Sequence, residues 1–250
     1  MSYRTLILYA LPSAVFSLPT IPIYTYLPSL YGDKLGLGLA VTGLVLFAAR
    51  IFDTIIDPIV GYFTDTLAIK GMRRKPWVLL GSIIAGIGLF NLLSPPMNVT
   101  ATYLFFWLVI LYGGWTMIII PYTAWGVDLS SDYFERTLIS ACREGLGLAG
   151  IIIASILGVF AGLGYFGAIS EIQIILISAM LMGLLFIPIM LILVPDHISK
   201  VELDKSFRNM FLISKYFKSL FTNKLFLRLV FIWFLNGIAN GVPAALLLLY

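Results

Sequence analysis

Three charged side chains lie inside the long apolar run ARIFDTIIDPIVGYF, and their spacing defines a candidate site. Arg50, Asp53 and Asp57 fall within about 60° of one another around a helix. An ionised carboxylate deep in a bilayer costs about 2.5–3.5 kcal/mol, so it needs a partner or a polar cavity. One arginine can neutralise one carboxylate, which leaves the other for a cation or a proton. The pattern therefore predicts an ion site, and a purely structural buried ion-pair cluster is the alternative.

The sequence around this cluster has the composition of an integral membrane protein. The chain is 60% hydrophobic and 11% charged, and its mean hydropathy is +1.02. Lipid admits only helices and closed barrels, and the apolar runs of this chain do not alternate, so they are assigned to helices. Each run is close to the length of about 20 residues that crosses a bilayer. The expected spans are residues 5–30, 39–64, 76–95, 101–126, 142–164, 171–194 and 226–250.

These spans predict an all-α membrane protein in three parts. Residues 1–195 form a six-helix bundle, residues 196–225 a polar cytoplasmic linker, and residues 226–250 a seventh membrane helix. The first span carries four prolines and is too long for a signal peptide, so we expect it to be retained. The last apolar run still continues at Tyr250, which suggests a truncated chain whose second half is missing.

The basic residues predict the orientation of the chain in the membrane. Of the 16 Lys and Arg residues, one lies before span one, four between spans two and three, two beside the loop after span four and seven after span six, fourteen in all on one side. Lys34 is on the other side, and Arg50 lies within a span. The positive-inside rule then places the N-terminus and these loops in the cytoplasm, with the protein in the cytoplasmic (inner) membrane.

Several functional classes are not indicated by the sequence. The net charge of +4 is explained by the cytoplasmic loops and needs no nucleic-acid partner. The sequence has no Gly-rich phosphate loop, no metal-ligand spacing of Cys and His, and no nucleophile–base pattern. We therefore expect neither an enzyme nor a cofactor other than a coupling ion.

A second motif follows span two, in the stretch DPIVGYFTDTLAIKGMRRKPWVLLG. Gly61, Asp65, Gly71, Arg73 and Arg74 match the pattern G-x-x-x-D…G-R-R/K of the loop between helices two and three in major facilitator transporters. The first glycine permits close helix approach, and the aspartate and the arginines can form a charge-assisted latch at the cytoplasmic face.

Because it carries both motifs, the chain resembles the glycoside–pentoside–hexuronide:cation symporters, the major facilitator family that includes melibiose permease. The stretch IIIPYTAWGVDLSSDYFERTLISACRE, residues 118–144, looks like that family's helix four, cytoplasmic loop and helix five. The resemblance covers the whole chain. It implies a major facilitator-type six-helix bundle followed by helix seven.

The resemblance also implies roles for the charged cluster. Asp53 and Asp57 match the two carboxylates that bind the coupling cation in that family, and Thr116 falls where the family places a hydroxyl ligand. Oxygen ligands suit a hard cation such as Na⁺, which would make the two aspartates a metal site. Ile56 stands where the family has an asparagine, so coupling to H⁺ stays open.

For the solute, the resemblance is less complete. Arg143 matches a sugar-site arginine, whereas Ser17 and Ile119 stand where the family has sugar-binding aspartates. Aromatic side chains can stack on a sugar ring, although in membranes they are also interface anchors or core residues. The candidates for stacking are Tyr24, Tyr26, Trp115, Tyr122 and Trp125. We predict that four residues bind the solute: Arg143, Ser17, Tyr24 and Trp115.

These features predict cation-coupled symport, with Na⁺ or H⁺, of a small polar solute of the sugar or glycoside class. The expected partners are that solute, the coupling cation and the lipid bilayer. One alternative is a lipid or amphiphile transporter of the same superfamily, and another is a non-transporting membrane interaction protein. Small residues at every fourth position of span five also predict close helix contact, at Gly150, Ala154, Gly158 and Gly162.

Overall fold

The computed structural model describes residues 2–20, 22–66, 72–167 and 170–196, together with short pieces between residues 222 and 236. For Asp65 and Thr66 only the backbone is described. The chain divides into two units, Met1–Ser199 and Lys200–Tyr250. Most of the predicted linker and of the seventh span lies outside the described residues. The described pieces there are largely helical, and the following account concerns the first unit.

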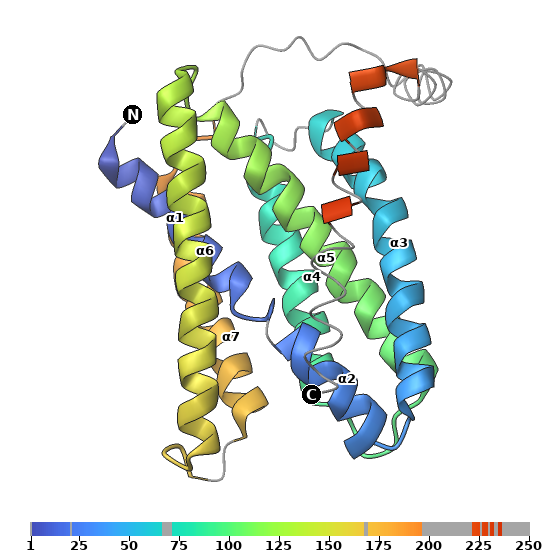
Figure 1. The fold of residues 1–250 in the computed structure, drawn as a ribbon. Helices are drawn as coiled ribbons and strands as arrows, with labels where there is room; N and C mark the ends of the chain where they lie inside the picture. The colour runs from blue at the N-terminus through green and yellow to red at the C-terminus, as the bar shows by residue number, and fades with distance from the viewer. Residues whose placement is uncertain are drawn as a thin grey trace. The chain divides into compact units, whose positions relative to one another are not determined.

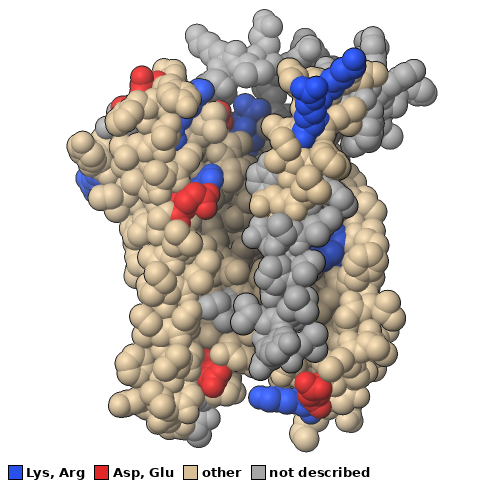
Figure 2. All heavy atoms as spheres, in the orientation of Figure 1, with Lys and Arg blue, Asp and Glu red and all other residues tan. Residues whose placement is uncertain are grey.

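The described part of the first unit contains six helical segments long and apolar enough to cross a membrane. This confirms the all-α membrane fold, and four of the six predicted spans agree with the observed helices within about two residues at each end. Charged side chains gather toward the two ends of the face shown in Figure 2, with few between them. The helices drawn in Figure 1 are α1 (Tyr3–Ser17), α2 (Leu27–Ser29), α3 (Leu39–Thr66), α4 (Lys75–Leu93), α5 (Ala101–Asp128), α6 (Tyr133–Gly162) and α7 (Glu171–Leu193).

The first span is a composite, which differs from the single helix predicted over residues 5–30. Beyond α1 the chain continues through two π-helical turns that flank α2, at Pro22–Tyr26 and Leu30–Lys34. A proline has no backbone N–H and clashes with the preceding turn, so prolines at this density break regular α-helical hydrogen bonding. Gly36 and Gly38 then adopt positive φ angles of 72° and 84° and connect this span to α3.

The fifth span begins nine residues earlier than the predicted boundary at residue 142, because α6 starts at Tyr133. The reason is a local cap: the Asp132 carboxylate accepts a hydrogen bond from the Glu135 backbone N–H at 2.9 Å. The Glu135 carboxylate accepts another from the Ser130 hydroxyl at 2.5 Å. Hydropathy locates the part of a helix that lipid can surround, and the polar first turns extend beyond it.

Glycines allow α4 and α5 to pack with their backbones in contact. A Cβ on Gly81 would lie 2.8 Å from the Gly114 carbonyl oxygen, and one on Gly88 would lie 2.9 Å from the Leu111 Cα. Such distances leave no room for any side chain. Close approach of this kind is how membrane helices gain dispersion energy, since lipid provides no hydrophobic drive for their association.

The predicted small-residue stripe of α6 also forms close contacts. Gly150 lies against the Ala14 backbone of α1, with no room for a Cβ, and Gly158 lies against Ile175 of α7. Helices α1, α6 and α7 therefore form one packed group, and α3, α4 and α5 form another, as Figure 1 shows. The two groups meet where α4 contacts α7 and α5 contacts α6, and where Tyr9 of α1 bonds to Tyr122 of α5.

Two tyrosines join α1 to α5 in the core. The Tyr9 hydroxyl donates to the Tyr122 carbonyl and the Tyr122 hydroxyl donates to the Tyr9 carbonyl, both at 2.7 Å. Their rings stack with centroids 4.7 Å apart. Gly126 lies beside this pair, where a Cβ would collide with the Tyr9 hydroxyl. Satisfying both phenols inside the bundle offsets the cost of burying them.

Candidate functional site

The charged cluster of α3 meets a hydroxyl of α5. Arg50 and Asp53, one helical turn apart, form an ion pair with 3.2 Å between Nη1 and Oδ2. Thr116, which is 4% exposed, places its Oγ1 at 3.2 Å from Asp53 Oδ1 and 2.8 Å from Asp57 Oδ1. The structure thus brings together all three residues predicted to bind the cation.

At the junction of Thr116 with Asp53 and Asp57, the number of available protons determines which contacts are favourable. A threonine hydroxyl has one hydrogen, so Thr116 can donate to only one carboxylate at a time. The other short contact is repulsive unless that carboxyl carries a proton of its own or a cation lies between the oxygens. Among the described residues, these two carboxylates and one arginine also leave one negative charge without a balancing partner. The cluster is therefore chemically suited to take up one positive charge.

The donor set restricts which ion could bind. Carboxylate and hydroxyl oxygens are hard ligands, which suit Na⁺ or a proton and not a soft transition metal. Among the residues that the structure describes, no three His, Cys, Asp or Glu side chains are grouped to hold a metal ion. The oxygen set here contains two such residues plus Thr116, so any further ligands would be backbone carbonyls, water or solute.

Arg50 is held by aromatic residues as well as by Asp53. Its Nη2 donates to the Tyr24 hydroxyl in a short hydrogen bond. Its guanidinium carbon lies 4.4 Å from the Tyr112 ring centroid and 5.2 Å from that of Tyr24, within cation–π range. Sequence reasoning missed Tyr112, although its position four residues before Thr116 places it on the same face of α5.

A cavity of about 180 Å³ adjoins this cluster. Two of the predicted solute-binding residues, Tyr24 and Trp115, line it together with Arg50 and Asp53. The other two lie between α1 and α6: Ser17 is close to Gly147, and the Arg143 backbone carbonyl accepts a hydrogen bond from Ser13 at 2.6 Å. The structure brings together the first two of the four predicted residues, and the other two do not line this cavity.

Two of the aromatic stacking candidates belong to the core. Tyr122 is 1% exposed and paired with Tyr9, and Trp125 is fully buried. The indole N–H of Trp125 donates to the Pro195 carbonyl at 2.9 Å. Their hydrogen-bonding groups are satisfied within the protein, which supports the core interpretation for both residues.

The structure describes some of the predicted latch residues. Arg74 is 4% exposed, and its Nε lies 3.3 Å from the Asp128 carboxylate at the end of α5. Its Nη1 also donates to the Thr64 carbonyl near the end of α3, at 3.4 Å. Gly61 approaches Ile120 of α5. Gly71 and the side chain of Asp65 lie outside the described residues, so their part in the latch stays a prediction.

An additional carboxylate completes this end of the bundle. Asp196, just after α7, accepts the backbone N–H groups of Arg73, Arg74 and Lys75 at 3.0, 3.1 and 3.3 Å. The first N–H groups of a helix have no partner within the helix and carry partial positive charge. Asp196 therefore caps the start of α4 from the segment that follows α7. We name Arg74, Asp128 and Asp196 the end cluster.

Comparison with known proteins identifies the family. Residues 8–250 match the family described as MFS/sugar transport protein. The chain belongs to this family. An uncharacterized symporter of Synechocystis sp. is 30% identical over 148 residues, 56% of this chain and 27% of that protein. The inner membrane symporter YicJ of Escherichia coli is 28% identical over 138 residues, 54% and 30% of the two chains.

A further relative carries a more specific name. The putative glycoside/cation symporter YagG of Escherichia coli is 26% identical over 155 residues, which are 55% of this chain and 33% of that protein. The matched stretch thus spans about a third or less of the length of these curated relatives. Membership of the MFS/sugar transport family makes this chain an integral membrane protein of a transporter family, in agreement with the six apolar helical segments found among the described residues.

Proposed function

We propose that the protein couples the movement of a cation, Na⁺ or H⁺, to the transport of a small polar solute of the sugar or glycoside class. The observation that carries this proposal is the junction at Thr116, where two carboxylates share one hydroxyl beside a single arginine. The names of the related symporters support the same activity.

The coupling follows from charge. A cation bound by Asp53, Asp57 and Thr116 neutralises negative charge inside the membrane and stabilises the conformation in which these oxygens converge. Solute then binds more tightly to that conformation, and the coupling is reciprocal, because each ligand raises the affinity for the other by the same factor. In this scheme the N-terminus and the end cluster lie on the cytoplasmic side.

The adjoining cavity would provide part of the solute site. Tyr24 and Trp115 offer aromatic surface for a sugar ring, and Arg50 and Asp53 offer hydrogen-bonding groups at its edge. A cavity of about 180 Å³ is smaller than typical ligand sites of roughly 300–1,000 Å³. Ser17 and Arg143, on α1 and α6, would contribute the remaining contacts in a conformation that closes around the solute.

The test is transport by the protein reconstituted in vesicles, with radiolabelled melibiose, xylose and methyl glucoside as probes and an imposed Na⁺ or pH gradient. We expect gradient-driven accumulation of at least one probe by the wild type. Asp57→Asn keeps the shape of the side chain but removes its charge, so accumulation should be abolished while downhill exchange persists. Accumulation by Asp57→Asn at the wild-type rate, with the same cation dependence, would reduce the cluster to a structural ion pair.

A further inference from the structure

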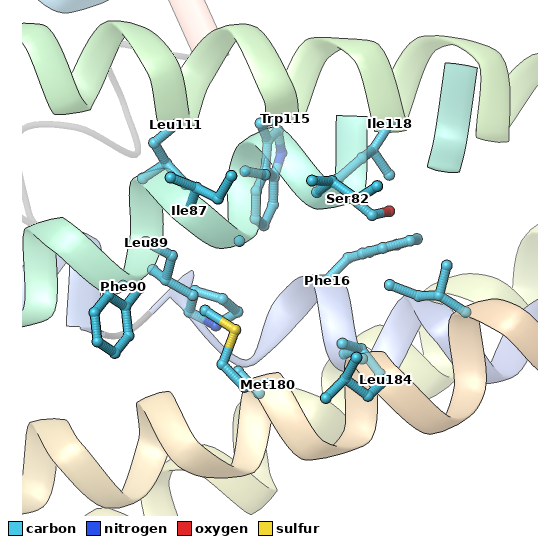
Figure 3. Close-up of a pocket in the computed structure, with 18 of the residues that line it drawn as sticks. Phe16, Ser82, Ile87, Leu89, Phe90, Leu111, Trp115, Ile118, Met180 and Leu184 are labelled. Atoms are coloured by element: carbon cyan, nitrogen blue, oxygen red, sulfur yellow. The ribbon is translucent and has the colours of Figure 1, made fainter. Parts of the chain in front are cut away.

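A second and larger cavity lies between four helices, away from the charged residues. Its volume is about 450 Å³, and its walls come from α1, α4, α5 and α7. Figure 3 shows Phe16, Trp115, Met180 and Leu184 around its interior. Leu111 and Trp115 line this cavity as well as the smaller polar one, so one wall separates the two spaces.

The lining indicates an apolar occupant. Among the described residues around this cavity none is charged. The Ser82 hydroxyl donates to the Val78 carbonyl at 2.7 Å, and the Asn91 amide donates to the Ile87 carbonyl at 2.8 Å. The Ser82 hydroxyl and one N–H of the Asn91 amide are therefore engaged within α4 itself.

The cavity is continuous with the apolar surface that the spanning helices present to lipid. Its floor is buried, as at Leu111 and Ile118, which are 1% and 3% exposed. Its rim is exposed, as at Ile83 of α4 and Leu184 of α7, which are 53% and 75% exposed. Apolar side chains this exposed on membrane-crossing helices form a surface that the bilayer interior can contact.

The shape of the cavity further restricts the kind of molecule that could occupy it. On α4 the lining extends from Leu79 to Asn91, about 18 Å at a rise of 1.5 Å per residue. A volume of about 450 Å³ spread over that length gives a mean cross-section of about 25 Å². A single extended hydrocarbon chain suits an apolar space of this length and width.

We propose that this cavity binds one acyl chain of a bilayer phospholipid, inserted between α4 and α7 and reaching Trp115. The chain fills space that would otherwise be a void lined by carbon atoms without contacts, and this void would cost stability. Because Trp115 also lines the polar cavity, the acyl chain would support the wall of that site from behind. The proposal does not depend on which solute or cation the protein carries.

The experiment measures contact between Trp115 and lipid chains. The protein is reconstituted in vesicles of dioleoylphosphatidylcholine or of the same lipid brominated at the double bonds, because bromine quenches tryptophan fluorescence on close approach. The difference in emission between wild type and Trp115→Phe isolates the signal of Trp115. We expect this signal to be strongly quenched in the brominated vesicles.

Two variants that fill the cavity provide the decisive comparison, each measured together with its own Trp115→Phe partner. A Cβ on Gly183 would have its nearest neighbour at 3.5 Å, and one on Gly86 at 3.9 Å, so a leucine at either position can extend into the cavity without backbone strain. Gly183→Leu and Gly86→Leu should each abolish most of the quenching. Gly43→Leu, on the exposed face of α3 with no atom within 4 Å of its Cβ, is the matched control and should keep it.

Two outcomes would overturn the proposal. One is a Trp115 signal that is equal in the two lipids, as expected if another part of the protein covers the cavity. The other is wild-type quenching in both cavity-filling variants, which would place the bromine atoms elsewhere around Trp115. Folding of each variant is checked by its thermal unfolding midpoint relative to wild type.

Discussion

Arg50 and Arg74 each pair with an aspartate, at nearly the same distance, in different regions of the molecule. Arg50 lies 3.2 Å from Asp53, and Arg74 lies 3.3 Å from Asp128. The side chain of Arg50 is 41% exposed, whereas that of Arg74 is 5% exposed. The other described contacts of the Arg50 guanidinium are with tyrosine side chains, while the Arg74 guanidinium also binds the backbone carbonyl of Thr64.

This contrast indicates what each cluster is suited to do. Side-chain partners can rotate, so Arg50 and its carboxylates can rearrange when a cation arrives. A backbone carbonyl and a capped helix end cannot move without moving the helix. The end cluster therefore fixes the ends of α3, α5 and α7 around the start of α4. The side chains of the charged cluster, Arg50, Asp53 and Asp57, can still change their positions.

The largest expected effect comes from the same substitution made in both clusters. Arg74→Gln removes a buried charge that holds Asp128, and we expect it to lower the free energy of unfolding by about 3 kcal/mol. Arg50→Gln leaves Asp53 and Asp57 able to take up a proton or a cation in place of the lost charge, so we expect it to lower the free energy of unfolding by less than Arg74→Gln does. Thermal or denaturant unfolding of the two variants in detergent measures the difference.

Arg50→Gln has a second expected consequence. It removes the positive charge nearest the carboxylates, so affinity for the coupling cation should increase, whereas Arg74→Gln should leave it unchanged. Equal losses of stability in the two variants, or a change in cation affinity on Arg74→Gln alone, would remove the distinction between the clusters.

The next prediction compares two buried threonines, Thr116 at the charged cluster and Thr64 near the end cluster. Thr116→Ala removes a neutral oxygen ligand and should weaken cation affinity by about 1–2 kcal/mol, roughly tenfold. Thr116→Ser keeps the hydroxyl and should retain affinity. Thr64 donates its hydroxyl to the Gly61 carbonyl within α3, so Thr64→Ala is the control and should not change it. The measurement is the cation concentration that gives half-maximal solute uptake, and a similar shift for both alanine variants would contradict the assignment of Thr116.

The smallest effect concerns Asp196. Asp196→Ala leaves three N–H groups at the start of α4 without their acceptor and should cost about 1 kcal/mol, as for loss of an N-cap. Asp196→Asn retains an acceptor oxygen and should behave nearly like wild type, since Asn and Asp are comparable caps. The unfolding midpoint measures both, and an unchanged midpoint for the alanine variant would show that α4 is capped in another way.

The sequence predicted those features that depend on neighbours along the chain. The spans that became α3, α4, α5 and α7 follow from the length of their apolar runs, and the pairing of Arg50 with Asp53 follows from helical spacing. The composite first span was not predicted, since hydropathy does not register how prolines redirect hydrogen bonds. The early start of α6 was missed because its first turns are polar.

The end cluster shows why other parts of the site could not be predicted. Arg74 and Asp128 are 54 residues apart, and the Arg74 backbone and Asp196 are 122 residues apart. Their meeting depends on how four helix ends are arranged, which no local pattern encodes. Thr116 entered the candidate site only through resemblance to a family. Tyr112, with no motif around it, did not enter at all.

The reciprocal hydrogen bonds of Tyr9 and Tyr122 limit how the two helix groups can move. Each phenol is anchored on the backbone of the opposite helix. Sliding α1 along α5 by one residue, about 1.5 Å, would displace each donor from its acceptor by more than half of the present 2.7 Å and so misalign both bonds. Tilting the helices about this point changes those distances little. The tyrosine pair therefore allows α1 and α5 to tilt against each other about this contact but prevents them from sliding along each other.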